Sequence, residues 1–217
     1  MAIRLSSSAS LVHFSSSDGL RIEGRLTKAS ADRAVVLCHP HPLHGGSMLT
    51  PVIMTAEQAF QEAGYTTLAF NFRGVGGSEG SYGEGRAEVA DVIGALGHLE
   101  EALGSQPKLM AVAGYSFGSY VAAMAAATDQ RVGFYLGIAP PLNHYDFGFL
   151  RQAICRVALI GGTHDEFCEA ARFRALYLSL PATPWIRVLE TDHFFTGALD
   201  DLAQVSRDAI AWLNAPA

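Results

Sequence analysis

The chain has 217 residues, of which 49% are hydrophobic and 17% are charged, and its formal net charge is −6. This composition excludes an intrinsically disordered chain and predicts a compact globular one. The net negative charge provides no basic face for nucleic acid or for an anionic membrane surface. We therefore expect a single domain over residues 1–217, with no nucleic-acid partner and no insertion into a membrane.

The N-terminus and the cysteines indicate the compartment. The first eight residues, MAIRLSSS, lack the long apolar core of a secretion signal. No apolar run approaches the roughly 20 residues that cross a bilayer. The three cysteines, Cys38, Cys155 and Cys168, are odd in number and show no metal-type spacing. We expect a cytoplasmic protein that needs no metal or cofactor, and we leave open whether it is a monomer or a homodimer.

The order of predicted elements indicates the fold class. Two alternating segments, 11–14 and 20–26, flank an Asp-Gly turn and predict a β-hairpin. Further strands are expected at 34–38, 66–71, 108–114, 133–138, 156–160 and 185–189, and helices at 48–63, 85–103, 119–128, 166–180 and 199–213. Apolar strands that alternate with helices form βαβ units with right-handed crossovers. The sequence therefore predicts an α/β fold: a mostly parallel twisted sheet with helices on both faces.

Residues 112–120 predict a buried strand, a Gly-Tyr-Ser-Phe-Gly turn and the start of a helix of small residues. A G-x-S-x-G pattern between a strand and a helix is typical of a nucleophile elbow. Gly114 and Gly118 would let the strand and the helix approach without a Cβ clash. The five-residue pattern alone also occurs by chance in glycine-rich chains, but this context indicates that Ser116 is a nucleophile.

A serine nucleophile needs a base within hydrogen-bond reach, and the base needs an orienting group. In a strand–turn–helix setting of this kind the chain order is serine, acid, histidine. Asp165 follows one predicted strand and His193 follows the last one, so we predict Ser116 as nucleophile, His193 as base and Asp165 as orienting acid. Asp146 is the alternative acid, and Asp165 could instead cap a helix. Asp192 is too close in sequence to His193 to orient it and more plausibly forms a turn.

Two backbone N–H groups should stabilise the developing oxyanion. One is expected from Phe117, directly after the nucleophile, and the other from the loop after the strand 34–38. Pro40 and Pro42 have no N–H, so His41 is the favoured second donor and Leu43 is the alternative.

Four residues around the predicted site need an interpretation beyond the triad. His39 and His41 could form a metal pair, but no carboxylate or cysteine stands at ligand spacing from them. We interpret Cys38 as buried strand packing. We interpret Arg73, in the segment Arg-Gly-Val-Gly-Gly-Ser, as an anchor between loops rather than a substrate contact.

Five motifs together resemble the α/β-hydrolase superfamily: HPHPLHGG at 39–46, NFRGVGGSEG at 71–80, GYSFG at 114–118, GTHD at 162–165 and DHFF at 192–195. The resemblance extends from about residue 20 to the end of the chain. More narrowly, the chain resembles small bacterial serine hydrolases without a lid that are distantly related to dienelactone hydrolase. The resemblance implies the triad Ser116, Asp165 and His193. Dienelactone hydrolase has a cysteine where this chain has Ser116, so its lactone chemistry is not implied.

Many members of the superfamily carry a cap domain after the strand that corresponds to 133–138. Here only residues 139–155 separate that strand from the next, so we expect a shallow, open site. The expected apolar rim comprises Pro140, Pro141, Leu142, Tyr145, Phe147 and Phe149, although such residues are equally compatible with plain core packing. The predicted substrate-binding residues are Leu43, Tyr115, Leu142 and Phe147. No charged residue is expected to converge there, which favours small to medium apolar substrates.

These patterns predict a serine hydrolase that works without a cofactor on a small-molecule ester, as a carboxylesterase does. A thioesterase or peptidase activity is the alternative within enzymes, because the triad is indifferent to the leaving group. A catalytically silent binding scaffold is the alternative outside enzymes, and it is disfavoured because Ser116 and His193 are both present. The fold alone would support none of these functions.

Overall fold

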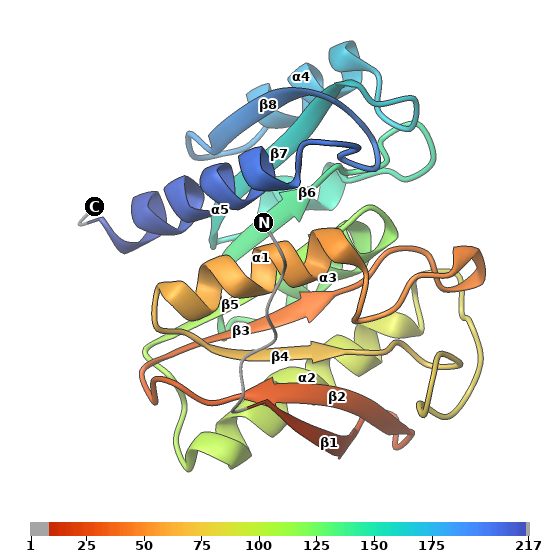
Figure 1. Cartoon of the computed structure of the whole chain (residues 1–217), viewed down its shortest axis with the longest axis vertical. Coiled ribbons are helices and arrows are strands. Elements are labelled where there is room, and N and C mark those ends of the chain that lie inside the picture. Colours follow the sequence, from red (N-terminus) through yellow and green to blue (C-terminus); the bar gives the residue numbers. More distant parts are fainter. Residues whose placement is uncertain (1–8, 216–217) are drawn as a thin grey trace.

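A computed structural model describes residues 9–215 of the chain, so the prediction made from residues 1–8 lies outside the described part. Its centre is one eight-stranded sheet in the order β1-β2-β4-β3-β5-β6-β7-β8 (Figure 1). The strands are β1 (Ser10–Ser15), β2 (Arg21–Thr27), β3 (Arg33–Cys38), β4 (Thr66–Phe70), β5 (Leu109–Tyr115), β6 (Val132–Ile138), β7 (Arg156–His164) and β8 (Trp185–Asp192). The α-helices are α1 (Pro51–Glu62), α2 (Glu88–Leu103), α3 (Phe117–Thr128), α4 (Ala170–Leu178) and α5 (Leu199–Asn214), and the 3₁₀ turns are η1 (Pro42–His44) and η2 (Gly148–Gln152).

The strand directions follow from the connections. Strands β1 and β2 form the predicted antiparallel hairpin, and β2 also pairs antiparallel with β4. From β4 through β3, β5, β6 and β7 to β8 every neighbouring pair is parallel, because each connection returns across a face of the sheet. The predicted fold class, a mostly parallel α/β sheet, is confirmed.

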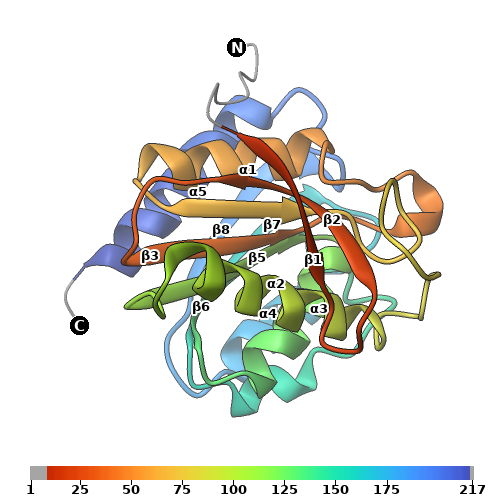
Figure 2. The same ribbon diagram turned by 90° about the horizontal axis from the view of Figure 1, so that it is seen from below.

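Helices cover both faces of the sheet. Helices α1 and α5 lie together on one face, and α2, α3 and α4 lie on the other (Figure 2). Each face has its own apolar core; Phe60 and Ile210 belong to the first, and Val121 and Phe173 to the second. Helix α3 is rich in alanine and buried on most sides, so it packs directly beneath β5, the strand that carries the serine turn.

Two boundary differences have physical causes. Helix α1 begins at Pro51, not at residue 48, because a proline is well placed at the first helical position after the cap residue Thr50. Strands β7 and β8 run further than predicted and pair as far as His164 and Asp192, with an irregularity after Gly162. A Cβ on Gly162 would lie 2.5 Å from the carbonyl oxygen of Thr191, so only glycine permits this close pairing.

The segment between β6 and β7 contains only loops and the short turn η2, so the described chain has no cap domain, as predicted. Within residues 9–215 no helix combines the length and apolar character needed to cross a membrane.

Arg73 joins the segment after β4 to two other parts of the fold. Its guanidinium lies 2.8 Å from a carboxylate oxygen of Asp91 on α2 and 2.9 Å from one of Asp18 in the β1–β2 turn. The Asp91 side chain is fully buried, so its charge depends on this partner. The interpretation of Arg73 as an anchor between loops is confirmed.

Replacing Arg73 with methionine removes the charged partner of a buried carboxylate while keeping a long side chain. We expect Arg73→Met to lower the free energy of unfolding by about 3–5 kcal/mol in urea denaturation followed by circular dichroism. The matched control is Arg131→Met, because Arg131 pairs with Glu100 and Asp129 but is 25% exposed. That control should lose about 1 kcal/mol or less. Equal losses in the two variants would contradict the role of Arg73.

Candidate active site

Ser116 lies on a strained turn between β5 and α3. Its backbone has φ 53° and ψ −123°, a region that costs a non-glycine residue about 1–3 kcal/mol. The turn is held on both sides, since the Ser116 N–H donates to the Ile138 carbonyl (2.9 Å) and the Ser119 hydroxyl donates to the Ser116 carbonyl (2.6 Å). The serine side chain is thereby fixed at the carboxyl ends of the parallel strands, where ligands bind in such sheets.

The two glycines of the turn are required by close backbone contacts. A Cβ on Gly114 would lie 2.2 Å from the carbonyl oxygen of Gly118. A Cβ on Gly118 would lie 2.2 Å from the carbonyl oxygen of Cys38, at the end of β3. Real Cβ atoms do not approach oxygen so closely, so the predicted reason for these glycines is confirmed.

Strand register brings Asp165 and His193 together. His164 on β7 and Asp192 on β8 are paired at the ends of their strands, so the next residue of each strand lies beside its counterpart. The His193 Nδ1 atom lies 2.8 and 2.9 Å from the two carboxylate oxygens of Asp165. One of those oxygens also accepts the N–H of Phe167 at 2.8 Å, which fixes the carboxylate.

The histidine joins the serine to the acid. His193 Nε2 lies 2.8 Å from the Ser116 hydroxyl oxygen. With its Nδ1–H donating to Asp165, the neutral ring presents Nε2 as an acceptor for the serine proton. The Asp165 and His193 side chains are 0% and 4% exposed, so water does not compete for their contact. The three predicted residues thus lie in the geometry that nucleophilic catalysis requires of a nucleophile, a base and an orienting acid.

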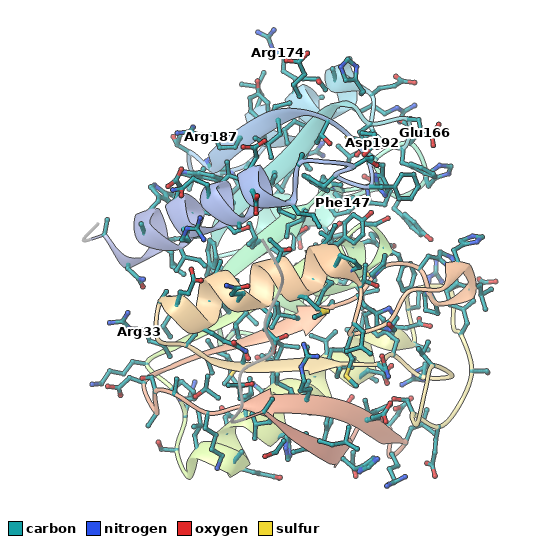
Figure 3. The ribbon with its side chains drawn as sticks, in the orientation of Figure 1. Arg33, Phe147, Glu166, Arg174, Arg187 and Asp192 are labelled. Atoms are coloured by element: carbon teal, nitrogen blue, oxygen red, sulfur yellow. The ribbon has the colours of Figure 1, made fainter. Side chains whose placement is uncertain are left out.

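The alternative acids are engaged elsewhere. An Asp146 carboxylate oxygen accepts the N–H of Gly148 at 2.8 Å and makes no contact with His193. An Asp192 oxygen accepts the N–H groups of Phe194 (3.0 Å) and Thr196 (2.9 Å), so Asp192 forms the predicted turn. Figure 3 shows Asp192 and Glu166, the residues next in sequence to the histidine and the acid, at the same edge of the molecule.

His39 is buried and holds the loop after β3 in place. Its Nδ1 donates to the Pro40 carbonyl (2.6 Å), and its Nε2 accepts the N–H of Phe72 (2.9 Å). Burial lowers the pKa of His39 to about 4. Both ring nitrogens are thus occupied, and among residues 9–215 no group of three histidine, cysteine or acidic side chains could hold a metal ion. Cys38, just before it, is completely buried, as predicted.

Hydrogen bonding in the loop after β3 distinguishes His41 from Leu43 as the second oxyanion donor. The Leu43 N–H donates to the ring Nδ1 of His41 at 3.2 Å and is not free. The His41 N–H has no acceptor in the part of the chain that the structure describes. The His41 and Phe117 rings pack together at 5.0 Å. Phe117 opens α3, so its N–H is among those without a partner inside the helix. The geometry therefore favours His41 over Leu43.

A cavity of about 660 Å³ opens at Ser116 and His193. Its other lining residues are Pro40, His41, His44, Gly45, Gly46, Thr50, Tyr115, Phe117, Pro141, His144, Tyr145, Phe167 and Phe194. Phe167 and Phe194 flank the His193 ring, with centroids 4.4 and 5.4 Å away. Neither was predicted, although each lies within two residues of a predicted acid or base, and that proximity is the signal that could have found them.

The predicted substrate-binding residues lie in three different places. Tyr115 lines the cavity, and its hydroxyl donates to the His193 carbonyl at 3.1 Å. Leu43 is 67% exposed and lies outside the cavity, because η1 turns it toward solvent. Leu142 and Phe147 are buried and line a neighbouring cavity instead, because their loop folds inward beside α4. Of the expected rim, Pro141 and Tyr145 do line the cavity at Ser116.

The family model described as alpha/beta hydrolase fold matches residues 34–165, and the chain belongs to this family. An uncharacterized protein of Rickettsia prowazekii is 31% identical over 91% of this chain and 87% of its own length. A solved structure from Xanthomonas campestris, described as an α/β serine hydrolase without lid, has a TM-score of 0.84 and 27% identity. That match covers 98% of this chain and 99% of the other. The chain is thus similar to serine hydrolases that also lack a cap.

A thiohydrolase of Arthrinium phaeospermum is 31% identical over 63% of this chain. The chain spans only 44% of the length of that relative.

His39 makes the stability of the fold dependent on pH. Its pKa falls from 6.5 in the unfolded chain to about 4 in the fold, so between these values only the unfolded chain binds the proton. The stability contributed by neutral His39 is complete above pH 6.5 and is lost as the pH falls toward 4. We expect the free energy of unfolding to drop by about 2 kcal/mol between roughly pH 7.5 and pH 5.

Urea titrations of the wild type and of His39→Gln at several pH values measure this effect. Glutamine keeps an acceptor for the Phe72 N–H but does not titrate, so the variant should lose this part of the pH dependence. An unchanged pH slope in the variant would contradict the assignment.

Proposed function

We propose that the protein is a carboxylesterase that acts on small to medium esters through an acyl-enzyme at Ser116. The observation that carries the proposal is the continuous hydrogen-bonded chain from Ser116 through His193 to Asp165, at 2.8 Å for each link, facing an open cavity. The fixed loop beside the serine supports it, because the N–H groups of Phe117 and His41 provide two donors for an oxyanion.

The first half-reaction forms the acyl-enzyme. The Ser116 oxygen attacks the ester carbonyl carbon while His193 Nε2 takes the hydroxyl proton. The carbonyl oxygen becomes an oxyanion, which the Phe117 and His41 N–H groups stabilise. The C–O bond to the alcohol then breaks, and His193 returns the proton to the leaving oxygen. Asp165 holds the ring in the required tautomer and stabilises the imidazolium throughout.

The second half-reaction repeats these steps with water. His193 removes a proton from a water molecule, whose oxygen attacks the acyl carbon of the Ser116 ester. Collapse of the second oxyanion breaks the bond to the Ser116 oxygen, which recovers its proton from His193. The products are the carboxylic acid and the free enzyme. The sequence of steps uses only this chain's residues and water.

A thioesterase is the second candidate. The triad acts on the acyl carbon and does not distinguish an alcohol from a thiol as leaving group. The relative named as a thiohydrolase, 31% identical over 63% of this chain, supports this candidate. Matched ester, thioester and peptide substrates of one acyl group, compared by kcat/KM, rank these alternatives.

Removal of the nucleophile tests the proposal directly. We expect the wild type to hydrolyse p-nitrophenyl acetate, butyrate or octanoate, and Ser116→Ala to lower kcat by roughly 10³- to 10⁶-fold. Fluorophosphonate should label the wild type and not the variant. An inert wild type that also resists labelling would contradict the esterase and favour the binding scaffold.

The second oxyanion donor proposed here can be removed by one substitution, with a control for the loss of the His41 ring. His41 has φ −52°, a value that proline adopts, so His41→Pro removes the N–H at this position with little backbone change. We expect kcat to fall by about 10²- to 10³-fold in this variant. His41→Ala is the matched control, because it loses the same ring but keeps the N–H and should stay within about 10-fold of wild type. Equal losses would assign the effect to the ring and not to the N–H.

A further inference from the structure

A second cavity of about 400 Å³ adjoins the one at Ser116. It lies between the loop that follows β6 and helix α4. His144 and Tyr145 line both cavities and form the wall between them. The Tyr145 ring stacks on Tyr120 at 4.5 Å, which holds this wall in place. The second cavity is therefore within reach of a substrate whose reacting carbonyl lies at Ser116 and whose chain crosses the edge of this wall.

The second cavity carries an excess of positive charge. Its lining includes Arg151 from η2 and Arg172 from α4, against one acid, Asp146. Arg151 has no ion pair or hydrogen bond among the described residues. Arg172 forms an ion pair with Glu169 at 3.7 Å, and both side chains are more than half exposed, so solvent screens this pair and a ligand anion can compete for the guanidinium. Arg151, which has no such partner among the described residues, can pair directly with a ligand carboxylate or phosphate.

Within the described part of the chain, the lining of the cavity at Ser116 contains no arginine, lysine or carboxylate, as expected, and the two arginines line the neighbouring cavity instead. Arg151 and Arg172 come from separate elements, and their approach depends on how η2 and α4 pack. Leu142 and Phe147, predicted to bind substrate at the serine, supply apolar surface to this cavity. The cavity thus combines an apolar wall with a cationic end.

We propose that the second cavity binds the anionic far end, a carboxylate or a phosphate, of a substrate whose ester or thioester bond lies at Ser116. This proposal rests on the proposed function. The neutral part of such a substrate lies along Tyr145 and Leu142, and its charged end lies between Arg151 and Arg172. Asp146 opposes the anion and limits the affinity. The protein would therefore prefer esters with a distal negative charge over neutral esters of equal length.

Matched substrate pairs test the preference. On the acyl side, p-nitrophenyl hydrogen suberate is compared with p-nitrophenyl methyl suberate, which has the same chain without the charge. On the leaving-group side, S-butyryl-4′-phosphopantetheine is compared with S-butyryl-pantetheine, which has the same chain without the phosphate. We expect the anionic member of at least one pair to have the higher kcat/KM, and the pair that shows it identifies the end that the cavity binds. The advantage should shrink as the salt concentration rises.

Substitutions of the arginines and of the aspartate in the second cavity should change the preference for anionic substrates in opposite directions. The double variant Arg151→Gln/Arg172→Gln should lower the ratio of anionic to neutral kcat/KM by about 10-fold and leave neutral esters unchanged. Asp146→Asn keeps the acceptor for the Gly148 N–H, removes the opposing charge, and should raise the ratio. Arg174→Gln is the matched control, because Arg174 lies on α4 outside the cavity and points away from the body of the molecule in Figure 3.

The outcomes separate this proposal from the catalytic one. An equal ratio in wild type and double variant for both substrate pairs overturns the anion site while the esterase stands. Calorimetry of monomethyl suberate with Ser116→Ala protein provides a readout that needs no turnover. Binding that is lost in the arginine double variant supports the site even if the protein hydrolyses nothing. Binding that is absent, or that survives the double variant, overturns it.

Discussion

The close packing of the serine turn against the end of β3 is the constraint on which the site depends. Gly118 lies so near the Cys38 carbonyl that no side chain fits between them, and Gly114 lies equally near Gly118. Helix α3 can therefore begin directly beneath the turn, which holds Ser116 at a positive φ. The strain of that conformation is balanced by the surrounding backbone contacts, and the result is a serine oxygen exposed to the cavity in a fixed direction.

The same contact fixes the loop after β3. Buried His39 ties that loop to Phe72 through a ring nitrogen, and Gly46 closes it, since a Cβ there would lie 2.1 Å from the Pro40 carbonyl oxygen. The His41 ring packs against Phe117 at the start of α3, so this loop is held against the serine turn. A donor positioned before the reaction costs no reorganisation during it, which is why loop rigidity and catalysis are linked in this proposal.

Much of this arrangement could be predicted because the determinants are local. Gly-Tyr-Ser-Phe-Gly between an apolar strand and a small-residue helix specifies one turn, and Asp165 and His193 follow strands in the required order. The pattern could not show that β7 and β8 continue to His164 and Asp192, because the glycines near the end of β7 and the polar residues at the end of β8 resemble loop sequence. Nor could it separate rim from core, since Leu142 and Tyr145 lie in one loop and their environments depend on where α4 packs.

The absence of a cap within the described chain changes how specificity can arise. A cap would enclose the substrate, whereas here the short segment between β6 and β7 lies beside the serine together with the loops after β3, β7 and β8. That segment forms a wall at Tyr145 and reaches the arginine of η2 beyond it. Selection in an open site must rely on contacts that water does not abolish. In the proposed mode of binding, the charged end of the substrate lies between two arginines and its chain lies over the apolar wall. A neutral substrate of the same shape would gain only the binding energy of the apolar contact.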